Sequence, residues 1–466
     1  MRPGTTRPLV QPAQAPHTPS PKARTVDKSL LFAALAYACG QVANFLFQLR
    51  LLDQLGPAQY GETGLAHLAL ITLIFLADLG YSSLFLREVR NSANWQHSWR
   101  YALGHRLLAT LLLLALVTLG CQMWGSTGAS RDYLFWAIPA CLFALFNYSS
   151  PMIAEGRRLA GLLVAQVAWP TALLIWWLLP AKSGLSSAAT AGLAFSLGYL
   201  SQALTSLVCS RRHLSLWLPM AGKGQLGPAL HLSLIGICGT LHDRLTPFLL
   251  APLASGFLPT LLILNHVLSG FSGIQAQLAR LLLPGAGTSQ GQRKIVNSAS
   301  LVIWATVVGL LIGMLLQDLP MLAEQRQWLA PAATLVLAWG VSASSGFFAT
   351  SLIGAHQEKP LLRLLMAGMI GSALLQISAA WMGSADALLW ARLLGMLAML
   401  AWLLRLLKLR LGRWGCAALG LSLPACTVGV ASWAATLGAM LLLPALVGLL
   451  RQAPCYVPVD DAEKCL

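Results

Sequence analysis

Three ionisable side chains stand next to one another in the middle of a long apolar run. The run reads GTLHDRLTPFLL over residues 239–250 and contains His242, Asp243 and Arg244. If it crosses a bilayer, each buried charge costs about 2.5 to 3.5 kcal/mol on insertion scales, so each needs a partner or water. Successive helical residues point about 100° apart, so Asp243 does not neutralise Arg244 on one face. The partners must come from elsewhere in the protein.

Two interpretations of this trio stay open. Asp243 and Arg244 could brace neighbouring helices, or Arg244 could line a wet vestibule that receives an anionic substrate. Guanidinium groups match phosphate oxygens in a two-pronged geometry, and further arginines lie at two depths of the predicted helices. The predicted cationic cavity contains Arg50, Arg244 and Arg392 in its outer half and Arg87 and Arg280 at its cytoplasmic end.

Ion coupling or gating needs groups that change charge within the membrane. We predict Asp78, Asp243 and His242 as candidates, although Asp78 suits a packing or hinge role equally well. His67, His231 and His266 could also relay protons, but a single histidine in a helix more often only satisfies hydrogen bonds. The nine cysteines are scattered without metal-ligand spacing, so the sequence predicts no metal and no cofactor.

The amino-acid composition indicates that most of these side chains lie in a membrane rather than in water. The 466 residues are 57% hydrophobic and only 10% charged, whereas soluble proteins carry about a quarter charged residues. Apolar blocks of about twenty residues match the length of a membrane-spanning helix. The lysines and arginines behind the net charge of +16 lie mostly between these blocks. This placement favours contact with anionic lipid head groups over nucleic acid.

The apolar blocks predict an all-α polytopic membrane protein of about fourteen helices, and twelve or thirteen are compatible with the same blocks. The last block, 415–450, is too long for one span and is divided into two short helices. The others lie near 29–51, 62–86, 102–124, 133–154, 159–180, 187–209, 227–253, 257–283, 295–317, 327–354, 361–382 and 386–409.

The connections between blocks predict the organisation and the orientation. Residues 1–28 form a disordered cytoplasmic tail, 29–210 a six-helix bundle, 211–226 a cytoplasmic linker and 227–410 a second six-helix bundle. Residues 415–450 add two helices, and 451–466 a cytoplasmic tail. Nearly all loop lysines and arginines then lie inside, with Arg50, Arg131, Lys182 and Arg326 outside. By the positive-inside rule both termini are cytoplasmic.

Two stretches carry a family resemblance. DQLGPAQYGETGLA at 53–66 and LADLGYSSLFLREV at 76–89 resemble signatures of bacterial polysaccharide flippases, which belong to the multidrug/oligosaccharidyl-lipid/polysaccharide (MOP) exporter superfamily. HDRLTPFLLAPLASGF at 242–257 is similar to the Asp-Arg pair and outer turn of that family's seventh helix. The chain departs from the pattern at Asp53, where a basic residue is common, and at DLPMLAEQRQW after the ninth span.

The resemblance implies two MATE-like six-helix bundles plus two C-terminal helices in the bacterial inner membrane. It implies a flippase that moves an undecaprenyl-pyrophosphate-linked oligosaccharide for O-antigen, exopolysaccharide or capsule export. Its partners would then include a polysaccharide polymerase or chain-length protein. No GxxxxGK[ST] loop is present to bind ATP, so we expect an ion gradient or downstream consumption to drive transport.

Alternatives remain inside and outside this superfamily. A cation-coupled drug antiporter and a lipid II flippase would share the same topology. A membrane glycan polymerase or ligase would also use a lipid-linked donor, but such enzymes need a sizeable outer loop that carries catalytic groups. The predicted outer connections are mostly about ten residues or fewer, so a transporter is favoured over an enzyme.

Overall fold

Helices are the only regular elements in the part of the chain that the structure describes. The structure is a computed structural model, and it describes residues 28–88, 95–123, 128–155, 157–179, 184–210, 217–282, 289–316, 326–354 and 357–408. Seven of the helices in these ranges are long and apolar enough to cross a membrane, or eight if one bent pair counts as a span. The predicted all-α membrane protein is confirmed. The predicted tails and the two helices at 415–450 lie outside the described residues.

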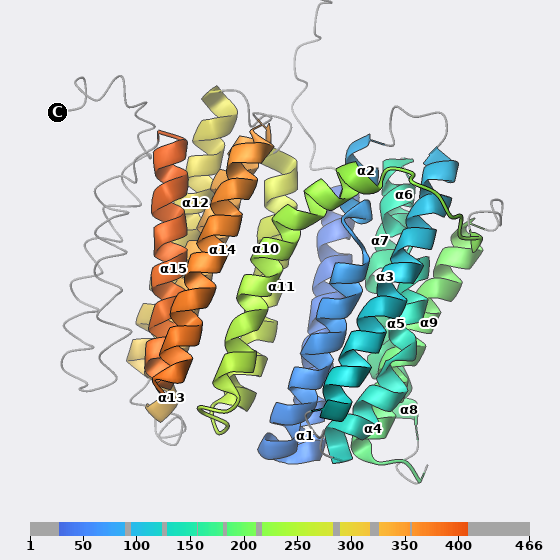
Figure 1. The fold of residues 1–466 in the computed structure, drawn as a ribbon, viewed down its shortest axis with the longest axis horizontal. Helices are drawn as coiled ribbons and strands as arrows, with labels where there is room; N and C mark the ends of the chain where they lie inside the picture. The colour runs from blue at the N-terminus through green and yellow to red at the C-terminus, as the bar shows by residue number, and fades with distance from the viewer. Residues whose placement is uncertain are drawn as a thin grey trace, which may run out of the picture.

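The first helix, α1 (Lys28–Ala77), is two arms joined at a sharp turn. Gly56 has φ 71° and ψ 167°, and Pro57 follows it. Glycine tolerates this left-handed conformation and proline lacks the amide hydrogen that would continue the helix. Tyr60 donates a hydrogen bond to Gln48 at 3.3 Å, although twelve residues of straight helix would separate them by about 18 Å. The two arms therefore pack against each other and correspond to the first two predicted spans (Figure 1).

The N-terminal helix group, α1 to α9, contains two broken spans. The fourth predicted span is divided into short helices, and the fifth bends by 43° between α7 and α8. Pro170, near the start of α8, cannot donate the amide hydrogen bond that would join the two. The group continues with α2 (Tyr81–Glu88), α3 (Trp95–Met123), α4 (Gly128–Ala137), α5 (Pro139–Phe143), η2 (Ala144–Phe146), α6 (Ser149–Ala154), α7 (Arg158–Gln166), α8 (Ala168–Leu178) and α9 (Ser187–Ser210).

The C-terminal helix group, α10 to α15, consists of long helices. Each of the twelve spans predicted before residue 410 falls on helix in the described ranges. Helices α10, α11 and α12 are not among the seven that qualify as spans, and in α10 the trio 242–244 lowers the hydropathy. The group comprises α10 (Leu226–Leu250), α11 (Leu258–Leu282), α12 (Ser289–Leu316), α13 (Arg326–Gly354), α14 (Glu358–Trp381) and α15 (Ala385–Leu406).

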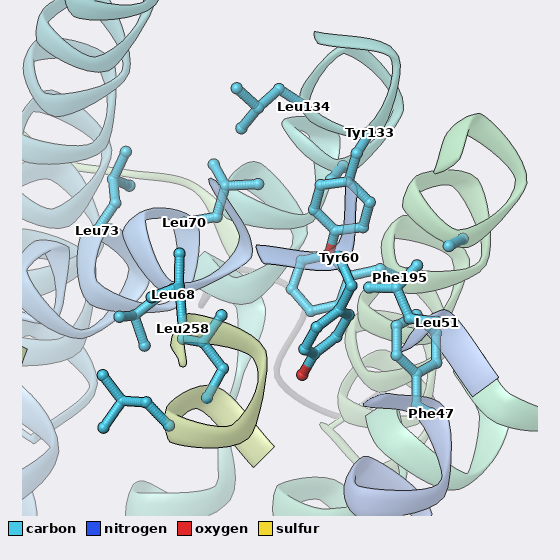
Figure 2. Packing of buried hydrophobic residues seen from close by; sticks show 14 of the residues in the cluster. Phe47, Leu51, Tyr60, Leu68, Leu70, Leu73, Tyr133, Leu134, Phe195 and Leu258 are labelled. Carbon is cyan, nitrogen blue, oxygen red and sulfur yellow. The ribbon is translucent and has the colours of Figure 1, made fainter. Parts of the chain in front are cut away.

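The two helix groups meet along α1, α10 and α11, which lie in the middle of the molecule in Figure 1. Gly64 of α1 sits so close to α11 that an added Cβ atom would lie 2.6 Å from Leu262. One buried hydrophobic cluster spans this contact at the predicted outer end, and Figure 2 shows part of it, with Leu258 of α11 near Tyr60 and Leu68 of α1. The two groups are therefore packed together at that end.

Candidate functional site

The ionisable side chains of His242, Asp243 and Arg244 on α10 have two different environments. Asp243 accepts a hydrogen bond and forms an ion pair with Arg392 of α15 at 3.1 Å. His242 hydrogen-bonds the Ser372 hydroxyl of α14 at 2.8 Å, through the Nε2 atom of its ring. One turn further on, Thr246 donates to Gln376 of α14 at 2.8 Å. Asp243 and His242 thus tie α10 to its own helix group, as the bracing interpretation expects for Asp243.

Arg392 is deeply buried, whereas its partner is half exposed. The Arg392 side chain is 7% exposed and that of Asp243 is 51% exposed. Two further nitrogens of Arg392, Nε and Nη1, are buried without a hydrogen-bond partner among the described residues. The structure therefore places Arg392 inside the C-terminal group, bound to a carboxylate, and its predicted contact with substrate stays a prediction.

Arg244 makes no hydrogen bond or ion pair with this network among the described residues. It is half-buried, and within the described ranges no hydrogen bond or ion pair holds its guanidinium. Its guanidinium instead lies within electrostatic reach of His67 of α1 and His266 of α11. Among the predicted cations whose side chains the structure describes, Arg244 is thus the one at the contact between the two helix groups.

His67 occupies an aromatic pocket of the N-terminal group. Its side chain is buried, and its Nδ1 atom hydrogen-bonds the Tyr133 hydroxyl of α4 at 2.5 Å. The Nε2 atom is buried and has no partner in the described part of the chain. The His266 ring centroid lies 6.2 Å away. Sequence reasoning considered both histidines singly, and no pattern in the sequence indicated that they would face one another.

Helical rise gives the depth of these three groups. At about 1.5 Å per residue, Arg244 lies about 9 Å from the end of α10 and His266 about 12 Å from the start of α11. His67 lies about 16 Å from the Gly56 turn by the same measure. Since the bilayer core is about 30 Å thick, Arg244 and His266 lie between its predicted outer surface and its centre, and His67 lies near the centre. We call them the inter-group cluster.

Arg50 lies apart from this cluster. Its guanidinium carbon is 5.0 Å from the ring centroid of Trp176 and 5.8 Å from that of Trp177, both on α8. A cation over an aromatic face is attracted to it, so α8 provides a partner for this charge within the N-terminal group. Arg87 and Arg280 lie on α2 and α11, and their side chains fall outside the described part.

Asp78 is held at the start of α2. It accepts hydrogen bonds from the Ser82 amide at 3.0 Å and the Ser82 hydroxyl at 2.8 Å, and it pairs with Arg106 of α3 at 3.4 Å. Arg106 is buried and lies 5.6 Å from the Trp99 ring centroid. These contacts fit the packing or hinge role. Arg106 was missed as the partner, although it lies inside the predicted third span, where a charge needs one.

Asp78 belongs to the D-L-G motif at 78–80, within the flippase-like stretch 76–89, and a steric constraint explains its glycine. Gly80 has φ 78°, and an added Cβ atom would overlap the backbone oxygen of Ala229 on α10. Next to it, the Tyr81 hydroxyl meets His105 at 2.7 Å, and His105 donates to the Gly222 carbonyl at 2.7 Å. The motif therefore fastens α2 and α3 to the segment that leads into α10.

Comparison of the sequence with models of known protein families finds no match, and comparison with curated protein sequences finds none either. Solved structures do match. The lipid II flippase MurJ in an inward closed conformation has a TM-score of 0.57 at 10% identity, covering 91% of this chain and 97% of that one. An outward-facing multidrug resistance MATE transporter of the MOP superfamily has a TM-score of 0.57 at 12% identity, over 81% and 94%.

A third match is a MOP superfamily transporter from Pyrococcus furiosus, with a TM-score of 0.52 at 14% identity over 81% of this chain and 94% of that one. The fold is that of MATE transporters and of MurJ. This likeness agrees with the MATE-like architecture that the sequence resemblance implied, and it extends over most of each chain.

Proposed function

We propose that the chain is a flippase that moves an undecaprenyl-pyrophosphate-linked oligosaccharide across the bacterial inner membrane. The product would supply O-antigen, exopolysaccharide or capsule export. Support comes from a fold shared with a lipid II flippase and from the flippase-like motifs at 53–66 and 76–89. The observation that carries the proposal is Arg244, a half-buried cation between the helix groups with no carboxylate bound to it in the described ranges.

The mechanism follows from where this cation lies. A half-buried guanidinium without a bound carboxylate favours an incoming anion, since the anion supplies the missing charge. The two helix groups would rock about their contact and open Arg244 to each side in turn. The pyrophosphate and sugar would pass between the groups while the polyprenyl chain stays in lipid. An ion gradient or downstream polymerisation would provide the direction.

Two transport alternatives differ in the chemistry of the substrate. A lipid II flippase would use the same cationic groups, because lipid II also carries a pyrophosphate. A drug antiporter that exports cations would be opposed by Arg244, since like charges repel in a low-dielectric site. The basic character of the inter-group cluster therefore favours a phosphate-bearing lipid over a cationic drug. A glycan polymerase is less favoured still, because the matched structures are transporters and flippases.

Deletion of the gene tests the function. We expect lipid-linked repeat units to accumulate in the cytoplasmic leaflet, measured by protection from an externally added glycosidase. Unchanged glycan assembly with altered drug tolerance would instead support the antiporter, and arrested peptidoglycan synthesis would support the lipid II flippase.

Arginine variants test the site. Arg244→Ala should abolish complementation of the deletion, whereas Arg244→Lys should retain part of it because a positive charge remains. Arg363→Ala is the matched control, since Arg363 is exposed on α14, and it should complement fully. Membrane levels of each variant are compared on immunoblots. Full complementation by Arg244→Ala would return Arg244 to the bracing interpretation.

A further inference from the structure

Two histidines from different helix groups face each other across the contact. His67 belongs to the second arm of α1, and His266 belongs to α11. Their ring centroids are 6.2 Å apart and their planes are inclined by 46°. His67 is enclosed by the rings of Tyr133, Trp169 and Phe195, of which Tyr133 and Phe195 are drawn in Figure 2. The pair therefore lies where any separation of the two groups would pull it apart.

The packing leaves some ring nitrogens of these histidines without hydrogen-bond partners among the described residues. The Nδ1 atom of His67 is hydrogen-bonded to the Tyr133 hydroxyl. Its other ring nitrogen, Nε2, is buried and has no partner among the described residues. His266 has no hydrogen-bond partner in those ranges either, and the same holds for Arg244. Buried polar atoms are nearly always bonded, so the unpartnered Nε2 atom of His67 indicates a place for a further polar group. His266 and Arg244 are half-buried beside it, and together the three side chains can meet an acceptor that enters from outside.

The charges around the pair point to the sign of that acceptor. Among the described residues, the charged or titratable groups within electrostatic reach of the two imidazoles are Arg244 and, for His67, His266. Neither is a carboxylate. Asp243 acts on Arg244, but it is engaged by Arg392. Next to Tyr133, on the α4, α9 and α5 side, the titratable neighbours are a phenol and a thiol, namely Tyr199 and Cys141.

We propose that His67, His266 and Arg244 form one site, shared by the two helix groups, which binds a phosphate-class anion together with a proton on the histidines. This proposal rests on the proposed function. A disubstituted pyrophosphate carries two negative charges, whereas Arg244 supplies one positive charge. A proton on either imidazole provides the second and turns the ring into a donor at both nitrogens.

Binding of the proton and binding of the anion then strengthen each other. In the empty site a proton would add a second positive charge beside Arg244, and the nearest described carboxylate, Asp243, is already engaged by Arg392. Once the anion is present, the same proton gains a counter-ion. Linkage is reciprocal, so a lower pH strengthens anion binding and anion binding takes up protons. Because the site has members in both groups, the bound anion also bridges the contact that must open during transport.

Calorimetry on the purified full-length protein tests this coupling. The probe is a short-chain prenyl diphosphate sugar, because its diphosphate has no proton that titrates where histidine does, between about pH 5 and about pH 8. Titrations in buffers of different ionisation enthalpy give the number of protons taken up with each probe molecule. We expect net proton uptake, and an affinity that rises as pH falls, by up to about tenfold per pH unit for one linked proton.

The variants separate the proton from the anion. His67→Gln/His266→Gln should bind the probe more weakly, with no proton uptake and no pH dependence, and Arg244→Gln should lose binding. His97→Gln, at an exposed histidine of α3, should match the unaltered protein. His266→Gln alone serves as a second variant if the double variant does not elute as a folded species, since His266 is only half-buried. It should reduce both proton uptake and the pH dependence.

The outcomes distinguish this inference from the function on which it rests. Proton uptake that persists in the histidine variants would overturn the proton site and leave the flippase proposal intact. No probe binding by the unaltered protein at any pH would overturn both. Competition by inorganic pyrophosphate would assign the site to the phosphate groups themselves, and binding of the prenyl-linked probe alone would assign it to a lipid head group. Either result supports an anion site.

Discussion

The ion pair between Asp243 and Arg392 offers the sharpest test of how α10 is held. Replacing Asp243 by Asn removes the negative charge but leaves the buried guanidinium of Arg392 in place. Breaking a fully buried pair in this way costs about 3 to 5 kcal/mol, and breaking an exposed pair costs less than about 1 kcal/mol. Since the two side chains are 7% and 51% exposed, the expected loss is intermediate, about 2 kcal/mol.

The assay is reversible unfolding in mixed micelles of mild detergent and dodecyl sulfate, followed by circular dichroism. Removal of both charges, in Asp243→Asn/Arg392→Met, should recover most of the loss because no unpaired charge remains. The coupling between the two sites should therefore exceed about 0.5 kcal/mol, the level at which independent sites add. Asp53→Asn, at an exposed carboxylate of α1, should change the free energy of unfolding by less than about 0.5 kcal/mol.

Two results would refute this reasoning. A loss below about 0.5 kcal/mol for Asp243→Asn, no larger than a surface substitution, would show that the pair does not brace α10. Additive effects of the two substitutions would show that Arg392 does not depend on Asp243. Transport by the stable double variant decides the remaining question about Arg392. Full transport would leave it a bracing residue, and lost transport with intact folding would make it a substrate contact.

Two further contacts can be tested by substitution. Gly64→Leu should block the approach of α1 to Leu262, because even an added Cβ atom would lie 2.6 Å from the leucine. The variant should have a lower thermal midpoint, measured by size-exclusion chromatography after heating. Leu262→Ala in the same chain should restore part of the midpoint. Asp78→Asn keeps an acceptor for Ser82 but loses the charge that faces Arg106, so it should lower the free energy of unfolding by about 1 kcal/mol. Asp78→Ala should lower it by at least about 1 kcal/mol more, because the start of α2 also loses its hydrogen-bond acceptor. Equal stability of the two Asp78 variants would contradict the hydrogen bond to the α2 amide.

Much of the fold was predictable because hydropathy acts locally. A run of about twenty apolar residues forms a helix in lipid wherever it occurs, so each span predicted before residue 410 coincides with helix. The Gly56-Pro57 turn and the D-L-G motif were likewise visible in the sequence. Their reasons were not, since Gly80 is required by the backbone of Ala229, nearly 150 residues away in the chain.

Broken helices were harder to predict. The fourth and fifth predicted spans are apolar throughout, yet α4 to α6 and the α7–α8 pair are interrupted. Prolines 139, 151 and 170 lie in these segments, but proline within a membrane helix is often tolerated when neighbouring helices satisfy the freed backbone groups. Whether it breaks the helix depends on the packing around it.

The sequence by itself determined that this is a helical membrane protein with a charged trio on α10 and further arginines at other depths. Only the tertiary structure decided which of them meet. Asp243 joins Arg392 across 149 residues, and His67 joins Tyr133 across 66. The rotation of each helix about its axis sets these partners, and that rotation is fixed by close contacts between neighbours. For that reason Arg392 lies inside one helix group, whereas Arg244 and two histidines lie between the two.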